Sequence, residues 1–174
     1  SETIQGDAND NYLDGYADGN DTLYGYAGND KLYGQYAVGV DFSTGSSSCG
    51  YQNSDYASND KLYGGAGNDQ LCGGLGDDTL DGGTGTDTII SGDGSDTIVI
   101  RSGDGSSDIA SADVITDFTD GSDVIGLDSI SFDALTIVQV SGDYSSHTLI
   151  SRTSTNEYLL IVQIFEQSDI DIDN

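Results

Sequence analysis

The sequence predicts an all-β protein: a right-handed parallel β-roll, or β-solenoid, of nonapeptide repeats with a C-terminal β capping segment. Three observations predict it: glycine-rich units recur every nine residues, an aliphatic residue holds one fixed position in each unit, and an aspartate holds another. The 25 glycines would indicate disorder in an aperiodic chain, but at a fixed period they indicate a solenoid.

The repeats are most regular in the middle of the chain. Four consecutive nine-residue units run from Gly64 to Val99 without a gap, as GGAGNDQLC, GGLGDDTLD, GGTGTDTII and SGDGSDTIV. Four altered units precede them and begin at Gly6, Gly15, Gly25 and Gly34. The last of these carries a 21-residue insertion at approximately residues 38–58, which we expect to project from the rim of the roll. The eight units predict a β-roll domain over residues 1–110.

Two positions of the unit carry the structural argument. Position eight is aliphatic throughout, at Leu13, Leu23, Leu32, Leu62, Leu71, Leu80, Ile89 and Ile98. Position six is acidic in every unit but the first, at Asn11, Asp21, Asp30, Asp60, Asp69, Asp78, Asp87 and Asp96. Stacked coils would bury the aliphatic ladder between two parallel sheets, each built from alternate coils, and would bring carboxylates of neighbouring turns together. Because the turns offer only oxygen ligands, Ca²⁺, which takes about six to eight of them, is the expected counter-ion.

The charge of the chain excludes several partners. Asp and Glu number 31 against 4 Lys and Arg, so the formal net charge is −27. Nucleic acid is excluded because phosphate neutralisation needs a basic surface, and anionic membrane surfaces are disfavoured for the same reason. The most apolar stretch, residues 159–162, is far too short to cross a bilayer, so no membrane insertion is expected.

The nonapeptide resembles the RTX (repeats-in-toxin) family of calcium-binding β-rolls, which lie in the C-terminal regions of type I-secreted proteins. The resemblance implies several Ca²⁺ ions, each held between two turns on the same side by carbonyl groups and by the position-six aspartate. Carried onto this sequence, the implied ligands are Asp21, Gly28, Asp30, Asn59, Asp60, Gly65, Gly67, Asn68, Asp69, Gly74, Gly76, Asp77, Asp78, Gly82, Gly83, Thr84, Gly85, Asp87, Asp93 and Asp96. Weaker sites are expected at the N-terminal end, where Asn9, Asn11, Tyr16, Tyr26 and Gln35 depart from the pattern.

Residues 111–174 are expected to form the cap. Asp113, Asp117 and Phe118, followed by Gly121 and Asp123, resemble the segment that closes the C-terminal roll of serralysin-like metalloproteases. The resemblance implies that Asp113 and Asp117 bind a terminal calcium ion, and the alternative is that they only cap strands.

The rest of the cap is predicted to be three strands and a tail. The stretches 135–140, 147–150 and 158–165 are rich in β-branched and aromatic residues, and these strands would cover the open end of the roll. The acidic tail SDIDIDN is compatible with the C-terminal region that type I secretion reads in this family.

The resemblance implies a non-catalytic module that ends a larger secreted bacterial protein, is monomeric as a fragment, and folds outside the cell when it meets calcium. Its partners would be calcium and the type I secretion apparatus. Catalysis is not expected here because His147 is the only histidine and no nucleophile has a base nearby in sequence, although a catalytic domain upstream of Ser1 is compatible with the family. The competing function is a calcium-dependent carbohydrate-binding module, similar to the R-modules of mannuronan epimerases.

Tyrosine and cysteine leave further alternatives open. Many of the 11 tyrosines hold two positions of the repeat, at Tyr16, Tyr24, Tyr26, Tyr33 and Tyr63. Such rings either form a platform for a glycan or cover the first coils by packing. Cys49 and Cys72 are either two free thiols or one disulfide, and the disulfide is predicted because the protein resembles secreted ones.

Overall fold

The computed structural model describes residues 1–16, 19–35, 57–119, 121–139, 147–155 and 157–163. Over these residues the chain is all-β apart from two short 3₁₀ helices, η2 (Ile109–Ser111) and η3 (Phe132–Ala134). The predicted fold class is therefore confirmed. No helix in this part of the chain is long and apolar enough to span a membrane.

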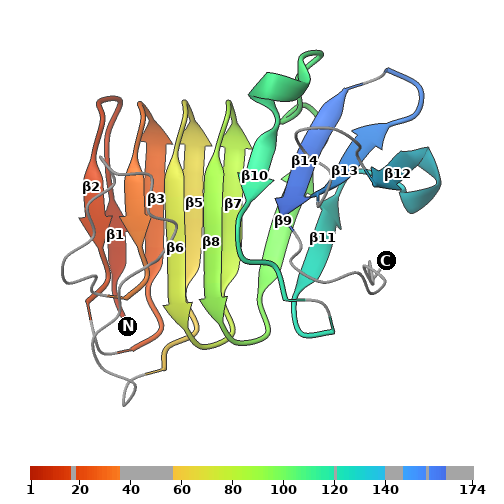
Figure 1. The fold of residues 1–174 in the computed structure, drawn as a ribbon. Coiled ribbons are helices and arrows are strands. Elements are labelled where there is room, and N and C mark those ends of the chain that lie inside the picture. The colour runs from red at the N-terminus through yellow and green to blue at the C-terminus, as the bar shows by residue number, and fades with distance from the viewer. Residues whose placement is uncertain (17–18, 36–56, 120, 140–146, 156, 164–174) are drawn as a thin grey trace.

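The strands belong to two sheets that the chain visits in alternation (Figure 1). One sheet has the order β1-β3-β5-β7-β9-β11, and the other has the order β12-β13-β14-β10-β8-β6-β4-β2. The repeat strands are β1 (Thr3–Gln5), β2 (Tyr12–Asp14), β3 (Thr22–Ala27), β4 (Lys31–Tyr33), β5 (Lys61–Ala66), β6 (Gln70–Leu75), β7 (Thr79–Thr84), β8 (Thr88–Asp93) and β9 (Thr97–Arg101). All pair in parallel, so each sheet is built from alternate coils, as the repeat predicts.

The strands of the regular coils are longer than the three residues centred on position eight. Strands β5 to β8 each run from position seven of one unit to position three of the next. Position eight is buried in every repeat, and Leu23, Leu62 and Leu80 are 0% exposed. The glycine at position two keeps a positive φ, for example 113° at Gly65, where a Cβ atom would collide with the carbonyl of Tyr26. Glycine therefore allows coils of one sheet to approach closely.

The register locates the insertion. The bonded pair Asp60 and Asp78 lies 18 residues apart, which is two nonapeptides. The equivalent pair Asp21 and Asp60, on either side of the insertion, lies 39 residues apart. The difference is 21 residues, the length that the sequence predicts. Ser58 already belongs to the next turn, since its N–H donates to the Leu75 carbonyl, so the insertion ends before it.

The roll continues into the predicted cap without a break in either sheet. Strands β10 (Asp113–Ile115) and β11 (Val124–Asp128) extend the two sheets, and they place Ile115 beside Ile89 and Ile125 beside Ile98. Strand β14 (Tyr158–Gln163) then pairs in parallel with β10. Strands β13 (His147–Arg152) and β12 (Leu135–Gln139) follow in antiparallel order.

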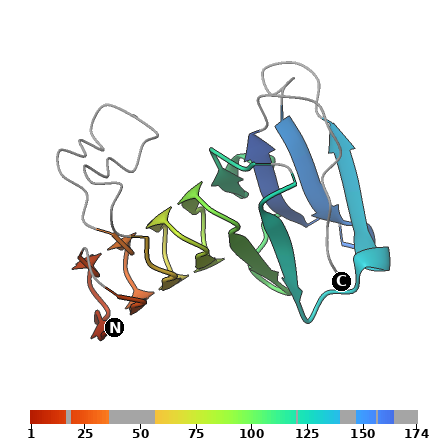
Figure 2. The same ribbon diagram turned by 90° about the horizontal axis from the view of Figure 1, so that it is seen from below.

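The three strands predicted for the cap are thus present, and they lie at one end of the row of coils (Figures 1 and 2). They also supply core residues, because Ile150, Leu160 and Val162 belong to the same buried cluster as the leucine ladder. The cap therefore closes the apolar interior at the C-terminal end of the roll.

Candidate calcium sites in the turns

The position-six aspartates form two rows of buried carboxylates, one on each side of the roll. All seven are at most 2% exposed: Asp21, Asp30, Asp60, Asp69, Asp78, Asp87 and Asp96. In each row, Oδ1 of one aspartate accepts a hydrogen bond from the backbone N–H of the position-six residue two coils earlier. The Asp60 N–H donates to Asp78 at 2.7 Å, and the Asp78 N–H donates to Asp96 at 2.8 Å. One oxygen of each carboxylate is therefore committed to holding the coils together.

The other oxygen is different. Oδ2 is buried without a hydrogen-bond partner among the described residues in six aspartates of the two rows: Asp21, Asp30, Asp69, Asp78, Asp87 and Asp96. A buried carboxylate oxygen with no partner is costly, because it has lost water and gained nothing. The same oxygen lacks a partner in six turns, always at position six of the repeat. This regularity indicates a site for a ligand that binds oxygen.

Burial also makes these carboxylates reluctant to ionise unless a cation is present. Loss of water raises the pKa of Asp78 to about 8 and that of Asp87 to about 7. The same cause raises the pKa of Asp60, Asp69 and Asp96 to about 6. A divalent cation would reverse this effect, since a positive charge beside a carboxylate favours its ionised form.

The glycine at position one shows where the oxygens converge. A Cβ atom on Gly64 would lie 2.5 Å from Oδ2 of Asp69 and 2.5 Å from the carbonyl oxygen of Gly82, which is in the neighbouring turn of the same side. A carboxylate oxygen of one turn and a carbonyl oxygen of the next thus approach the same place. Equivalent positions occur at Gly25, Gly34 and Gly73. This donor set fits Ca²⁺, which accepts carboxylate and carbonyl oxygens in flexible geometry.

No cluster of three or more His, Cys, Asp or Glu side chains suited to a metal is present in the part of the chain that the structure describes. A calcium site here would include the backbone carbonyls that approach the carboxylates, as the resemblance implies. The structure does place the expected turns side by side: the N–H of Gly67 donates to the Thr84 carbonyl, and that of Gly76 donates to the Asp93 carbonyl, each at 2.9 Å.

Position five forms a second ladder, which the sequence does not reveal. The side-chain oxygen of Asn59 accepts from the N–H of Asp77 at 3.0 Å, and that of Asp77 accepts from the N–H of Ser95 at 3.0 Å. Asn68 accepts from Thr86 in the same way. In this ladder the acceptor lies upstream of the donor, whereas at position six it lies downstream. The side chains of Asn59, Asn68 and Asp77, predicted as ligands, thus tie exposed turns together.

The N-terminal coils keep the backbone of the turn but change its side chains. Tyr16 and Tyr26 occupy position two with φ of 63° and 76°, the left-handed conformation that glycine holds elsewhere, which costs roughly 1–2 kcal/mol per residue. Asn11, in place of aspartate, turns back to its own coil, where Oδ1 accepts from the Asp7 N–H at 2.8 Å. These differences support the expectation of weaker sites there.

The predicted cap ligands lie at the end of the two rows. Oδ1 of Asp113 accepts from the Asp87 N–H at 2.8 Å, and burial raises the pKa of Asp113 to about 8. Asp123, which was not predicted as a ligand, holds the same place in the other row and accepts from the Asp96 N–H at 3.1 Å. The sequence signal was present, since D-V-I at 113–115 and again at 123–125 repeats positions six to eight, and the aspartate of the second copy ends the same D-G-S-D that occurs at 93–96. Asp117 contacts the last turn of the repeats instead.

The tyrosine rings face one another. The rings of Tyr24 and Tyr63 stack with centroids 5.0 Å apart and planes 9° apart, and Tyr26 stacks on Tyr24 at 6.0 Å. The stacked faces of these rings cover one another, which favours packing over a platform for a sugar. Glycan binding stays a prediction.

Cys72 is disulfide-bonded in the structure. Its predicted partner, Cys49, lies outside the described residues. Cys72 is 3% exposed beside the core residue Leu71. The bond therefore begins in the wall of the roll.

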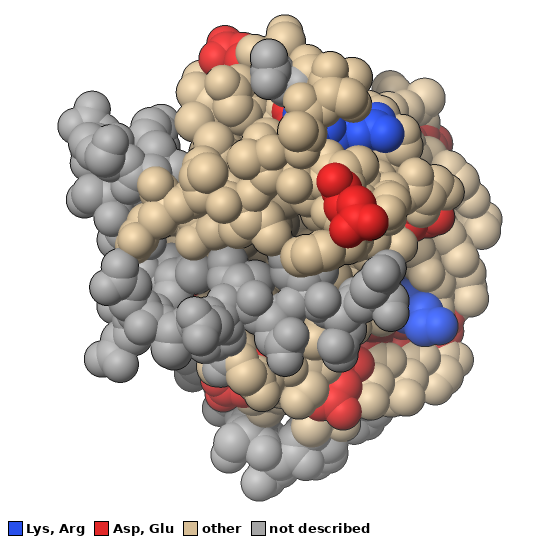
Figure 3. Space-filling view, turned by 90° about the vertical axis from the view of Figure 1, so that its right-hand side faces the viewer, with Lys and Arg blue, Asp and Glu red and all other residues tan. Residues whose placement is uncertain are grey.

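The acidic rows are not a surface feature. Figure 3 views the cap end of the molecule, where acidic groups are dispersed among neutral ones and some basic groups are visible, among the residues that are not grey. The largest concentration of aligned carboxylates is inside the turns, where all seven position-six aspartates are buried.

The comparison with known families agrees with this geometry. The sequence model of the family described as RTX calcium-binding nonapeptide repeat (4 copies) matches residues 17–35, 55–80 and 73–109. Among solved structures, the chain is similar to the solution structure of the AlgE6R3 subunit from the Azotobacter vinelandii mannuronan C5-epimerase. The identity is 25%, the match covers 91% of this chain and 72% of that chain, and the TM-score is 0.39. A comparison with curated proteins gave no match. All seven position-six aspartates lie inside the matched segments.

Proposed function

The chain contains RTX calcium-binding nonapeptide repeats folded as a β-roll, and on that premise we propose that it is a calcium-triggered folding module of a larger secreted protein. The ligands would be the position-six carboxylates together with carbonyls of positions one and three in the turn two coils further on. This fragment would bind calcium and catalyse no reaction, and the catalytic activity of the whole protein would belong to a domain upstream.

The observation that carries the proposal is the set of six buried Oδ2 atoms that have no hydrogen-bond partner in the part of the chain that the structure describes. Without a cation, folding has to bury these carboxylates either charged and unpaired or protonated. Each bound Ca²⁺ adds two positive charges to a chain whose formal net charge is −27. Ligation that occurs only in the folded state contributes directly to the free energy of folding.

Secretion follows from the same physics. A chain of this charge repels itself and would stay unfolded where calcium is scarce, which suits export by the type I secretion apparatus in an extended form. Outside a bacterial cell, calcium would bind and the roll would form. We propose the extracellular location and the C-terminal placement on this argument and on the resemblance to type I-secreted proteins.

The experiment is circular dichroism of the chain in EDTA and then in millimolar CaCl₂, with the number of bound ions counted by equilibrium dialysis. We expect a largely disordered spectrum that becomes β-rich as several ions bind, and MgCl₂ at the same concentration serves as the control. An equally β-rich spectrum in EDTA and in calcium at neutral pH would reject the proposal.

A further inference from the structure

Two kinds of buried carboxylate occur in this molecule. In six of the seven position-six aspartates, one oxygen accepts an N–H and the other has no partner among the described residues, as at Asp78 and Asp96. The exception is Asp60, whose Oδ2 accepts from the Ser58 hydroxyl at 3.0 Å. At the junction with the cap, both oxygens are bonded. Asp117 accepts from the N–H of Ser91 through Oδ1 and from the N–H of Gly92 through Oδ2, each at 2.9 Å.

Asp123 shows the same pattern on the same turn, where the Ser91 hydroxyl contacts both carboxylates. Its Oδ1 accepts from the Asp96 N–H at 3.1 Å, and its Oδ2 accepts from the Thr119 N–H at 2.8 Å. The carbonyl of Gly94, in the same last turn, accepts from the Ser122 hydroxyl at 2.6 Å. Oδ2, which lacks a partner among the described residues in six aspartates of the rows, thus faces an N–H donor of the protein here.

We propose that Asp117 and Asp123 end the roll as a metal-independent clamp, which holds the last glycine turn against the cap through hydrogen bonds without either carboxylate binding calcium. The positive ends of N–H dipoles point at both oxygens of each carboxylate, so a cation would have to displace these hydrogen bonds or approach against them. The inference rests on the proposed calcium binding of the repeats, since it distinguishes the last turn from them.

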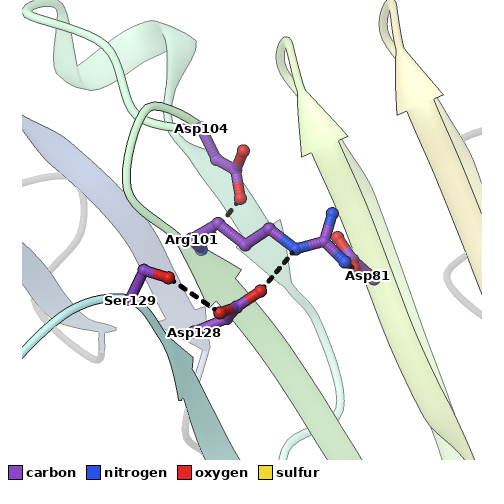
Figure 4. Close-up of polar contacts among 5 residues, drawn as sticks. All are labelled: Asp81, Arg101, Asp104, Asp128 and Ser129. Carbon is purple, nitrogen blue, oxygen red and sulfur yellow. Dashed lines mark hydrogen bonds and ion pairs between the residues drawn. The ribbon is translucent and has the colours of Figure 1, made fainter.

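Arg101 completes the metal-independent junction on the neighbouring face (Figure 4). Its guanidinium pairs with Asp81 of β7, which is 1% exposed, and its Nε pairs with Asp128 of β11 at 3.2 Å. The Arg101 backbone N–H donates to Asp104 at 2.8 Å. The Arg101 side chain thus neutralises a buried carboxylate and joins a repeat strand to a strand beyond the repeats.

The consequence is an order of assembly. A contact with the cap that needs no ion gives the last turn a fixed place, on which the next coil can form its two ladders, and each calcium ion then fixes one further coil. In a solenoid, where each unit contacts only its neighbours, such a pre-formed end lowers the cost of the first coil.

The test counts the calcium ions bound by the full chain at saturating CaCl₂ in Asp117→Asn, Asp123→Asn and the matched control Asp96→Asn. We expect Asp96→Asn to bind at least one ion fewer. Asp117→Asn and Asp123→Asn should bind as many ions as the wild type but unfold at a temperature lower by about 2–4 °C or more. Arg101→Gln should likewise keep the ion count and lower that temperature, whereas loss of an ion in either cap variant overturns the clamp.

A second measurement covers the case in which a cap variant fails to fold. Anomalous scattering from crystals of the wild-type chain loaded with Tb³⁺ locates the ions directly. We expect ions beside Asp78 and Asp96, and an ion within about 2.6 Å of a carboxylate oxygen of Asp117 or Asp123 would overturn the inference. Absence of calcium binding by the wild-type chain would instead reject the proposed function, so the two failures are distinguishable.

Discussion

The backbone N–H of Asp78 donates a 2.8 Å hydrogen bond to Oδ1 of Asp96, and Oδ2 of both residues is buried without a partner among the described residues. One carboxylate thus performs two tasks: it fixes the spacing of two coils and it offers an oxygen to a ligand between them. Because Oδ1 makes the contact between coils and Oδ2 is the oxygen offered to a ligand, a substitution at this position can remove the ligand oxygen and keep the contact.

Asp78→Asn makes that separation, since the amide retains one oxygen for the Asp60 N–H and loses the negative charge. We expect calcium to bind at least about tenfold more weakly to the sites next to this turn, which is about 1.4 kcal/mol. The control is Asp77→Asn, which removes the same charge at an exposed position whose oxygen holds the Ser95 N–H. Calcium titrations followed by circular dichroism compare the midpoints, and equal midpoints in the two variants would contradict the role assigned to Oδ2.

The fold and the core were predictable because they depend on one period. Leu71 and Leu80 are nine residues apart and lie in opposite sheets, which follows from the repeat alone. The adjacency of Asp69 and Asp87 follows from the same period. These positions are predictable because the conformation of each coil depends only on its own turns and on contact with the neighbouring coils.

The other features of the site depend on the direction in which a side chain reaches and on partners outside the nine-residue repeat. The ladder at Asn59 and Asn68 was not predicted because the sequence does not show which neighbouring coil an amide reaches. Asp123 was not recognised as a member of the rows because it lies 27 residues after Asp96, whereas the regular spacing is 18 residues. The pair of Arg101 and Asp81 was missed because an arginine two residues beyond the last repeat reaches back 20 residues.

Acid should partly replace calcium. Burial raises the folded-state pKa of Asp87 to about 7 and of Asp78 to about 8, above the value of 3.8 expected in an unfolded chain. The protonated carboxyl group therefore favours the folded state. This contribution is fully present below about pH 4 and is lost as the pH rises through about 7 to 8. Circular dichroism in EDTA should show more β-structure at pH 5 than at pH 8.

The same linkage predicts that calcium binding releases protons at pH 5, where the calcium-free chain is already folded with these carboxyl groups protonated, and few at pH 8, where the carboxylates of the unfolded chain are already ionised. Calorimetric titrations in two buffers of different ionisation enthalpy measure that release. No proton release, together with the same spectrum in EDTA at pH 5 and pH 8, would show that these carboxylates do not titrate in this range.

The disulfide at Cys72 should stabilise the roll. If Cys49 is its partner, the bond closes a loop with 22 residues between the two cysteines, which is worth about 3 kcal/mol in the chain-entropy model. We expect Cys72→Ser to lower the urea midpoint of the calcium-loaded chain and to raise the calcium concentration needed for folding. Cys49→Ser should have the same effect. Intact mass under non-reducing conditions checks the bond, and two alkylatable thiols in the native protein would reject it.

Asp117 should matter more than Asp21 for calcium-induced folding. Both oxygens of Asp117 hold backbone N–H groups of the last regular turn, and this turn adjoins the most regular coils. Asp21 lies in the degenerate N-terminal coils, where its Oδ1 accepts from the Glu2 N–H at 2.5 Å in the first coil. Loss of Asp21 therefore frays the end of the roll, whereas loss of Asp117 removes the surface on which the first regular coil forms.

We accordingly expect Asp117→Ala to raise the calcium midpoint and lower the cooperativity of folding more than Asp21→Ala does. Deletion from Asp113 onward should have the largest effect, because it removes β10 and β11 and exposes the core residues Ile89 and Ile98, which pack against Ile115 and Ile125. In the wild-type chain, folding would therefore start at the C-terminal end and proceed toward the N-terminus, the order that suits a chain exported C-terminus first. Calcium titrations by circular dichroism measure midpoint and cooperativity in all three variants, and a larger loss in Asp21→Ala than in Asp117→Ala would reverse the proposed order.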